Sequence, residues 1–294
     1  MRLLGLVTKR KRLPIGIDIG TESIKMLQFQ VSPGHAPLVA AAAVWRFPPG
    51  ASQDPAQRRQ QTVEAVTSML RHGGFRGRDV VSALSCSQVG IKNIRLPRMP
   101  PTELQAAIKW EATERFGFEV SDDQLNWIDA GEVRSGNDTV QELILLVAKQ
   151  EAIDNHLAML SAMKLTPVAI DAEPLAMFRV FGRFLRREED EQTAKVLLDL
   201  GASGTRVLVA RGRQIVFIKG LEVGGSALTA AVSGQFNLSE EDAAQFRLRA
   251  MQQESARVAA QGDDVGDALV DWNIQDAVRG TLESLAEELA LCLR

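Results

Sequence analysis

Two segments far apart in this chain share one strand-and-turn pattern. Residues 15–21 read IGIDIGT and residues 196–205 read VLLDLGASGT, so each apolar run ends in Asp-x-Gly followed by a hydroxyl residue. An alternating run follows each segment, at 23–29 and at 206–210, and predicts a second strand antiparallel to the first. A single copy would predict only a hairpin turn. Two copies with the same continuation indicate an internal duplication, and therefore a fold built from two related halves.

Each turn carries the groups that a metal-bound phosphate needs. A carboxylate at the end of a buried strand is costly to desolvate unless a cation meets it, and a hydrated Mg²⁺ ion would do so. Asp18 and Asp199 are therefore predicted to face Mg²⁺ through water. Gly20 and Gly201 lack the Cβ that would block a phosphate. The hydroxyl groups predicted to bind phosphate oxygens, together with N–H groups of the turns, belong to Thr21, Ser203 and Thr205.

A duplicated hairpin with two phosphate turns facing one cleft resembles the actin-like ATPase superfamily, which includes actin, Hsp70 chaperones, sugar kinases and the division protein FtsA. The resemblance implies an α/β fold with duplicated RNase H-like halves that binds ATP and Mg²⁺. After the first hairpin, the sequence predicts a third strand at 37–45 and a helix at 58–70. Strand, strand, strand, helix is the order that the resemblance leads one to expect for a half.

Composition excludes several other classes of protein. With 294 residues and 45% hydrophobic content, the chain can bury a core in two or more domains. Its net charge of −3 gives no indication of nucleic-acid binding, although residues 9–12 form a local KRKR cluster. No apolar run reaches the roughly 18 residues of a membrane span, which predicts a cytoplasmic protein. Two cysteines and three scattered histidines predict no metal cluster.

The segment 80–164 is predicted to be an α+β unit inserted into the first half. Its expected strands are 80–84, 89–96 and 140–149, and its expected helices are 103–116 and 150–163. Thr102 and Gln105 form a capping-box pattern that predicts the start of the first of these helices. The other predicted parts are a basic flexible N-terminus at 1–12, the first half at 13–79 and 165–192, and the second half at 193–294.

Four longer segments look like the type IV pilus assembly protein PilM family. They read PIGIDIGTESIK at 14–25, LPRMPPTELQAAIKWEA at 96–112, IDAEPLA at 170–176 and LEVGGSALT at 221–229. The similarity runs from residue 9 to residue 294. It implies an FtsA-like arrangement in which the insertion is a 1C subdomain, placed beside subdomain 1A. Proteins of that family bind ATP and hold the short cytoplasmic N-terminal tail of the membrane protein PilN, in a groove between the 1C subdomain and its neighbour.

The function implied by this resemblance is scaffolding at the inner membrane. The protein would be cytoplasmic, peripheral to the membrane and part of the pilus inner-membrane assembly complex, and it could form homo-oligomers. The resemblance leaves ATP turnover open, so the protein is expected to be at most a slow ATPase.

The resemblance assigns two phosphate motifs, which comprise Asp18, Gly20, Thr21 and Lys25 in the first and Asp199, Gly201, Ser203 and Thr205 in the second. Lys25 would supply a point charge to the phosphates. The alternative for Lys25 is an exposed strand lysine.

Four further residues are candidates for the site, and three of them have a second interpretation. Asp171 and Glu173 lie where superfamily members orient the attacking water, so either could support hydrolysis. Asp171 is equally explained as the N-cap of a helix that ends near Phe184. Gly224 and Gly225 fit the nucleotide-side turn of the second half, and a tight loop before a helix would look the same.

The chain departs from the family pattern on the adenosine side. Where the family usually has Ala-Glu-x-x-Lys around the ribose and adenine, this chain has Ala244 in place of the acid and Arg247 in place of the lysine. The lost hydrogen bond is expected to weaken ribose binding by about 1.5–3 kcal/mol. Lys219 also stands where the family commonly has arginine. The chain stops within a predicted helix at 274–293, before the superfamily's last Gly-Gly turn, so the second half is expected to be incomplete.

Three other classes of protein are alternatives to a scaffold. The cytoplasmic part of a type II secretion L-type protein is the closest rival. An FtsA-like division protein would need a C-terminal amphipathic anchor, whereas this chain ends in EELALCLR with two acids. A sugar kinase would need a catalytic base in a substrate loop and a complete adenosine motif, and the sequence has neither.

Overall fold

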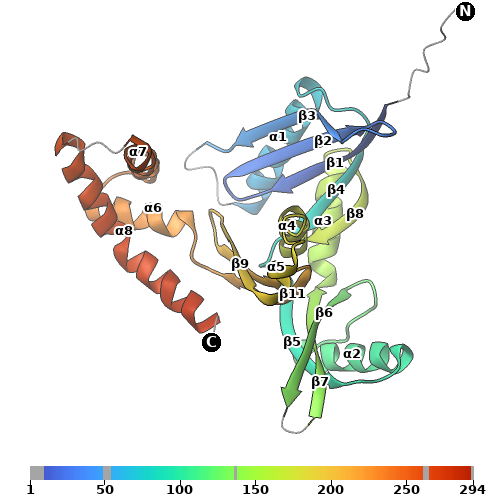
Figure 1. Ribbon diagram of the computed structural model, residues 1–294. Coiled ribbons are helices and arrows are strands. Elements are labelled where there is room, and N and C mark those ends of the chain that lie inside the picture. Colours follow the sequence, from blue (N-terminus) through green and yellow to red (C-terminus); the bar gives the residue numbers. More distant parts are fainter. Residues whose placement is uncertain (1–9, 49–53, 136–137, 261–264, 293–294) are drawn as a thin grey trace, which may run out of the picture. The chain divides into compact units, whose positions relative to one another are not determined.

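The computed structural model describes residues 10–48, 54–135, 138–260 and 265–292 as a mixed α/β structure (Figure 1). Its described residues form two compact units. The first unit contains residues 10–47, 54–195 and 210–216, and the second contains residues 48, 196–209, 217–260 and 265–292. Residues 1–9 of the predicted flexible N-terminus lie outside the described residues, but Lys11 and Arg12 already belong to the first strand. The predicted boundary at residue 12 is therefore too late.

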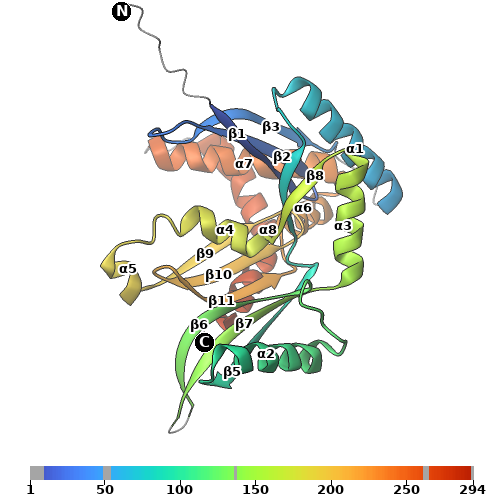
Figure 2. The ribbon, with the colours of Figure 1, turned by 90° about the vertical axis from the view of Figure 1, so that its right-hand side faces the viewer.

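A five-stranded sheet forms the main layer of the first unit. Its order is β3-β2-β1-β4-β8, with β1 antiparallel to β2, β2 antiparallel to β3, and β4 parallel to both β1 and β8. The strands are β1 (Lys11–Ile19), β2 (Ser23–Val31), β3 (Leu38–Arg46), β4 (Asp79–Leu84) and β8 (Thr166–Ala172). Helix α1 (Pro55–His72) follows β3 and contacts β2 and β3 (Figure 2). The predicted order of three strands and a helix is confirmed.

Alternation along β1 and β2 separates the two faces of this sheet. Ile15 and Ile17 of β1 are buried with Ile24 of β2, whereas Asp18 and Lys25 are exposed on the opposite face. Successive side chains of a strand point to opposite faces, so the alternating sequence fixes this separation. The apolar face forms the core, and the acidic and basic residues of the first turn stay on the other face.

The inserted unit begins later than predicted. The expected first strand at 80–84 corresponds to β4, which pairs with β1 and β8 of the first sheet. Val80 and Leu84 are buried there together with Ser82. Because only a short turn separates β4 from β5 (Val89–Pro97), the sequence resembles a hairpin, but parallel pairing with two other strands overrides that local pattern.

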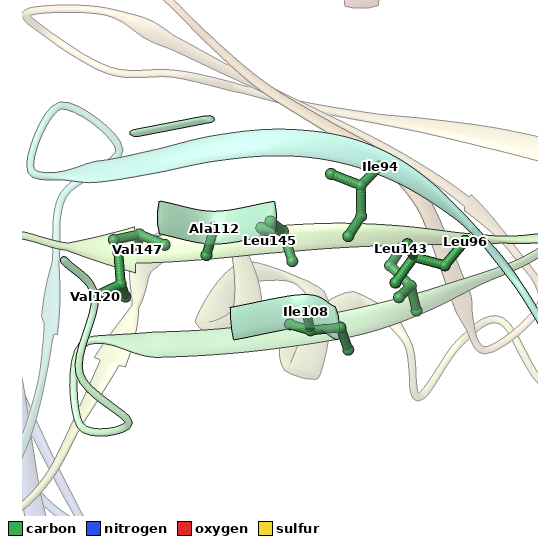
Figure 3. Close-up of a cluster of buried hydrophobic side chains, with 8 residues drawn as sticks. All are labelled: Ile94, Leu96, Ile108, Ala112, Val120, Leu143, Leu145 and Val147. Atoms are coloured by element: carbon green, nitrogen blue, oxygen red, sulfur yellow. The ribbon is translucent and has the colours of Figure 1, made fainter. Parts of the chain in front are cut away.

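The inserted unit has a sheet of its own, with the order β5-β7-β6. β6 (Leu125–Ser135), a strand that the sequence does not predict, pairs antiparallel with β7 (Asp138–Ala148), and β7 pairs antiparallel with β5. Helix α2 (Pro101–Phe116) packs on this sheet through Ile108 and Ala112. Figure 3 labels the buried cluster, which consists of Ile94, Leu96, Ile108, Ala112, Val120, Leu143, Leu145 and Val147.

The predicted capping box of α2 is wrong. The N-cap residue is Pro100, no side chain caps the helix, and Thr102 already lies in its first turn. Pro101 occupies the first helical position, where its fixed φ and missing N–H favour a helix start. Two consecutive prolines therefore determine where α2 begins.

The third sheet has the order β11-β10-β9. Its strands are β9 (Ala194–Leu200), β10 (Thr205–Arg211) and β11 (Gln214–Leu221). Three helices follow, which are α6 (Gly225–Phe236), α7 (Glu240–Ala260) and α8 (Val265–Cys292). Buried Val232, Ala243 and Ile274 hold these helices together. None of the helices in the described part of the chain is long and apolar enough to cross a bilayer.

A buried histidine joins α3 (Gln150–Ala162) to β4. His156 is 5% exposed, and its Nε2 lies 2.8 Å from the Ser82 hydroxyl oxygen. Burial lowers the pKa of His156 below its ordinary value of 6.5. The folded protein therefore holds His156 neutral at pH values where the unfolded chain begins to take up a proton.

We expect the protein to lose stability as the pH falls below about 6.5, by up to about 1.4 kcal/mol per pH unit from this residue. Above that pH, neither state protonates His156 and its contribution is complete. Urea unfolding between pH 5.5 and pH 8 measures the slope, and His156→Gln should flatten it. The same change at exposed His72 should leave the slope in place, and equal slopes in both variants would contradict the assignment.

Candidate functional site

The two predicted phosphate turns have the same backbone geometry. In the β1–β2 hairpin, the Gly20 N–H donates to the Ser23 carbonyl at 2.9 Å. In the β9–β10 hairpin, the Gly201 N–H donates to the Gly204 carbonyl, also at 2.9 Å. The internal duplication that the sequence predicts is therefore present as two hairpins closed by equivalent hydrogen bonds.

Each aspartate of these turns forms an ion pair with a basic residue of the following strand. Lys25 Nζ lies 2.7 Å from Asp18 Oδ2, and the two residues are cross-strand partners in the β1–β2 register. Arg206 Nη1 lies 3.4 Å from Asp199 Oδ2. The sequence reasoning missed Arg206, although the spacing from Asp199 to Arg206 repeats the spacing from Asp18 to Lys25. Lys25 lies on β2 with its side chain 56% exposed, which agrees with the alternative of an exposed strand lysine, and its contact with phosphate stays a prediction.

The turn glycines lie close to other atoms of the chain. A Cβ on Gly201 would lie 2.2 Å from Nη1 of Arg206 and 3.0 Å from the Gly204 carbonyl oxygen. A Cβ on Gly20 would lie 3.1 Å from the Ser23 carbonyl oxygen. Room for a phosphate is thus not the only reason for glycine at these positions, and the predicted phosphate contact stays a prediction.

Thr205 does not present its hydroxyl to a ligand. Its side chain is 2% exposed, and Oγ1 donates to the Val223 carbonyl at 2.6 Å. The prediction that Thr205 binds phosphate is corrected accordingly, because a buried hydroxyl satisfies its hydrogen bond inside the protein. Thr21 and Ser203 are exposed residues of their turns, and their contact with phosphate stays a prediction.

Gly224 and Gly225 attach the start of α6 to the second turn. The Gly225 N–H donates to the Gly201 carbonyl and the Ser226 N–H donates to the Ala202 carbonyl, both at 2.9 Å. Gly224 is the N-cap residue of α6. The interpretation as a tight loop before a helix is confirmed, and a nucleotide contact of these glycines stays a prediction.

Arg247 of α7 lies at the same place. Its Nε donates to the Thr229 hydroxyl at 3.2 Å, and its Nη2 would lie 3.7 Å from a Cβ on Gly225. The second unit thus gathers the turn, the start of α6 and Arg247, which are three of the features that the sequence assigns to nucleotide binding.

The first sheet brings Asp18 and Asp171 to one face. Gly16 of β1 pairs with Val81 of β4, so Asp18 and Ala83, each two residues further along, lie on the same face. Ala83 in turn pairs with Asp171 of β8. The backbones at the two aspartates are thus about 10 Å apart, which is twice the distance between neighbouring strands. Both residues lie near the carboxyl ends of the parallel strands β1, β4 and β8. Ligands of open α/β sheets bind at such strand ends.

Asp171 is not the N-cap of the following helix. Helix α4 (Glu173–Phe181) has Ala172 as its N-cap residue, and it ends before Phe184. The Asp171 carboxylate instead forms an ion pair with Arg179 of α4, and its Oδ1 accepts from the Ala172 N–H at 2.9 Å. Glu173 Oε2 accepts from the Cys86 N–H at 3.2 Å. Both carboxylates have protein partners, and a role in orienting water stays a prediction for each.

Arg58 supports the first turn and was not found from the sequence. This residue of α1 donates to the Thr21 carbonyl, and its guanidinium lies 3.3 Å from the centre of the Phe47 ring. Arg58 lies near the start of α1, but the carbonyl group to which it donates is 37 residues away in the sequence. Only the fold brings the two together.

A family model described as type IV pilus assembly protein PilM matches residues 16–255. A chain of a solved "PilM-PilN type IV pilus biogenesis complex" is 26% identical, with 94% of this chain and 75% of that chain covered and a TM-score of 0.70. The ethanolamine utilization protein EutJ from Carboxydothermus hydrogenoformans is 14% identical, with 95% and 72% covered and a TM-score of 0.50.

The cytoplasmic domain of EpsL, an inner membrane component of the type II secretion system of Vibrio cholerae, is 10% identical, with 76% of each chain covered. Its TM-score of 0.40 is too low to bear on the function of this chain. The likenesses to the pilus complex and to EutJ confirm the predicted α/β actin-like ATPase fold.

Proposed function

The chain belongs to the type IV pilus assembly protein PilM family, and from this membership we propose that it is an ATP-binding scaffold that holds a PilN-like tail. The match over residues 16–255 is the observation that carries the proposal, because it includes both turns and the inserted unit. The protein acts on the cytoplasmic side of the inner membrane, where it is peripheral and joins the pilus assembly complex.

The proposed partner is the cytoplasmic N-terminal tail of a PilN-like membrane protein. A relative that is 26% identical was solved as a PilM–PilN complex, which supports a partner of this kind. We place the tail near α2 of the inserted unit. Ile108 and Ala112 of this helix are buried against the sheet, whereas Trp110 is 63% exposed and available to a peptide. An aromatic side chain of this kind is a frequent anchor of protein interfaces.

The proposed ligand is ATP with Mg²⁺, bound by both turns. In the described residues, no group of three or more His, Cys, Asp or Glu side chains could hold a metal ion by itself. Mg²⁺ is typically bound by one or two carboxylates, substrate phosphates and several waters. One carboxylate in each turn therefore fits an ion that arrives with the nucleotide. When bound, Mg²⁺ would neutralise phosphate charge.

Different residues of this chain would then contact different parts of the nucleotide. Asp18 and Asp199 would hold the ion through water, and the exposed hydroxyl groups of Thr21 and Ser203 would contact phosphate oxygens. Arg247, beside the start of α6, would lie on the adenosine side. Asp171 is the stronger candidate for orienting a water molecule, because it shares the sheet face of Asp18. Its ion pair with Arg179 engages that carboxylate, which is consistent with slow hydrolysis at most.

Capture by a tail peptide tests the scaffold. We expect the full chain to bind an immobilised peptide with the sequence of the PilN-like tail from the same organism. Trp110→Ala should weaken binding about tenfold or more, as truncation of an interface anchor does. Phe184→Ala is the matched control, because Phe184 is 64% exposed but lies outside the inserted unit. Failure of the wild-type chain to bind the tail would refute the proposed partner, and equal loss in both variants would refute the place.

A further inference from the structure

The basic partners of the two turns differ in their surroundings. The Lys25 side chain is 56% exposed, whereas the Arg206 side chain is only 17% exposed. The Arg206 guanidinium is packed so closely under the turn that a Cβ on Gly201 would lie 2.2 Å from its Nη1. The absence of a side chain at Gly201 therefore leaves the space beside this turn that Nη1 of Arg206 occupies.

A guanidinium at this position has consequences that a lysine would not have. Arginine keeps its charge at every pH relevant to a protein, and its planar N–H groups match phosphate or carboxylate oxygens in pairs. Arg206 pairs with Asp199 and its side chain is only 17% exposed, so its conformational freedom is already restricted. An ordered cation loses little conformational entropy when it binds an anion.

We propose that Arg206 is a phosphate-binding residue of the second turn and, as the counter-ion of Asp199, positions that carboxylate. The inference rests on the proposed binding of ATP. It adds a ligand residue that the family resemblance does not assign, and it makes the two turns equivalent, since each then contributes one carboxylate and one cation. The ligand class is a nucleotide with a di- or triphosphate, whose negative charge Arg206 would contact.

Two substitutions separate charge from packing. Arg206→Lys keeps the positive charge but loses the planar fork, and Arg206→Met keeps much of the side-chain volume but loses the charge. Titration of each full-length variant with a fluorescent ATP analogue and Mg²⁺ gives the dissociation constant. Far-UV circular dichroism and a melting curve establish that each variant is folded, and Arg206→Gln replaces the Met variant if that one does not fold.

We expect the Met variant to bind Mg-ATP about ten- to a hundredfold more weakly, and the Lys variant, which keeps the charge but loses the paired N–H groups, to lie between the Met variant and wild type. If Met and Lys behave alike, Arg206 acts only through packing and the inference is overturned. If both variants and wild type bind equally well, the inference fails while the proposed ATP site stands. If the wild-type chain does not bind Mg-ATP, the proposed ATP binding fails, and the inference fails with it.

Discussion

Replacing Gly224 with alanine is expected to destabilise the second unit by about 3 kcal/mol and to abolish binding at the second turn. The new Cβ would lie 2.4 Å from the Gly204 nitrogen, 2.5 Å from the Ala202 carbonyl oxygen and 2.8 Å from the Gly201 carbonyl oxygen. All three are backbone atoms, so no side chain can rotate to relieve the overlap. The turn must open, and the hydrogen bonds that tie α6 to it must lengthen or break.

Urea unfolding and Mg-ATP titration measure the two effects on the same sample. Gly234→Ala is the matched control, since Gly234 lies within α6 and a Cβ there would meet no atom within 4 Å. Alanine in a helix interior is favoured over glycine by about 1 kcal/mol, so this variant should be slightly more stable and should bind normally. A Gly224→Ala variant that melts with wild type would show that the loop adapts, contrary to the geometry.

The duplicated hairpins could be predicted from the sequence because all their determinants are local. Apolar alternation sets each strand, Asp-x-Gly marks each turn, and the two copies reinforce each other. The residues that support the turns could be predicted only in part. Lys25 came from the motif, but Arg58 and the Thr205 hydroxyl bond carbonyl groups 37 and 18 residues away, respectively. Local patterns carry no information about such distant partners.

The errors in the inserted unit have the same origin. β4 and β5 were both assigned to the inserted unit because they are close in sequence, whereas β4 pairs with β1 and β8 of the first sheet. β6 was missed because its sequence lacks a strong apolar alternation, and it is a strand through its pairing with β7. Asp171 looked like a helix cap because Pro174 follows it closely, but its carboxylate has Arg179 as its partner. Tertiary pairing decided each case.

Replacing Asp18 and Asp199 together with alanine is expected to remove the Mg²⁺ dependence of ATP binding. In wild type, Mg²⁺ should tighten binding, because the ion joins each carboxylate to the phosphates through water. In the double variant this contribution is lost, and Mg-ATP affinity should fall by about tenfold or more, which is the size of one lost charge-assisted interaction. Fluorescent-ATP titration with Mg²⁺ and with a chelator measures both quantities.

The titration with a chelator should show the opposite effect of the double substitution on ATP affinity. Without Mg²⁺, the double variant should bind ATP at least as tightly as wild type, because Lys25 and Arg206 no longer have their carboxylate partners and both attract phosphate. Asp122→Ala with Asp276→Ala is the matched control. It removes the same charge and two exposed ion pairs, to Lys109 and Arg279. Exposed pairs of this kind contribute about 0–1 kcal/mol, so the control should keep the Mg²⁺ dependence of wild type. If instead the double variant and the control respond to Mg²⁺ alike, the two turns do not hold the metal-bound phosphates, and the duplicated carboxylates serve only to pair with Lys25 and Arg206.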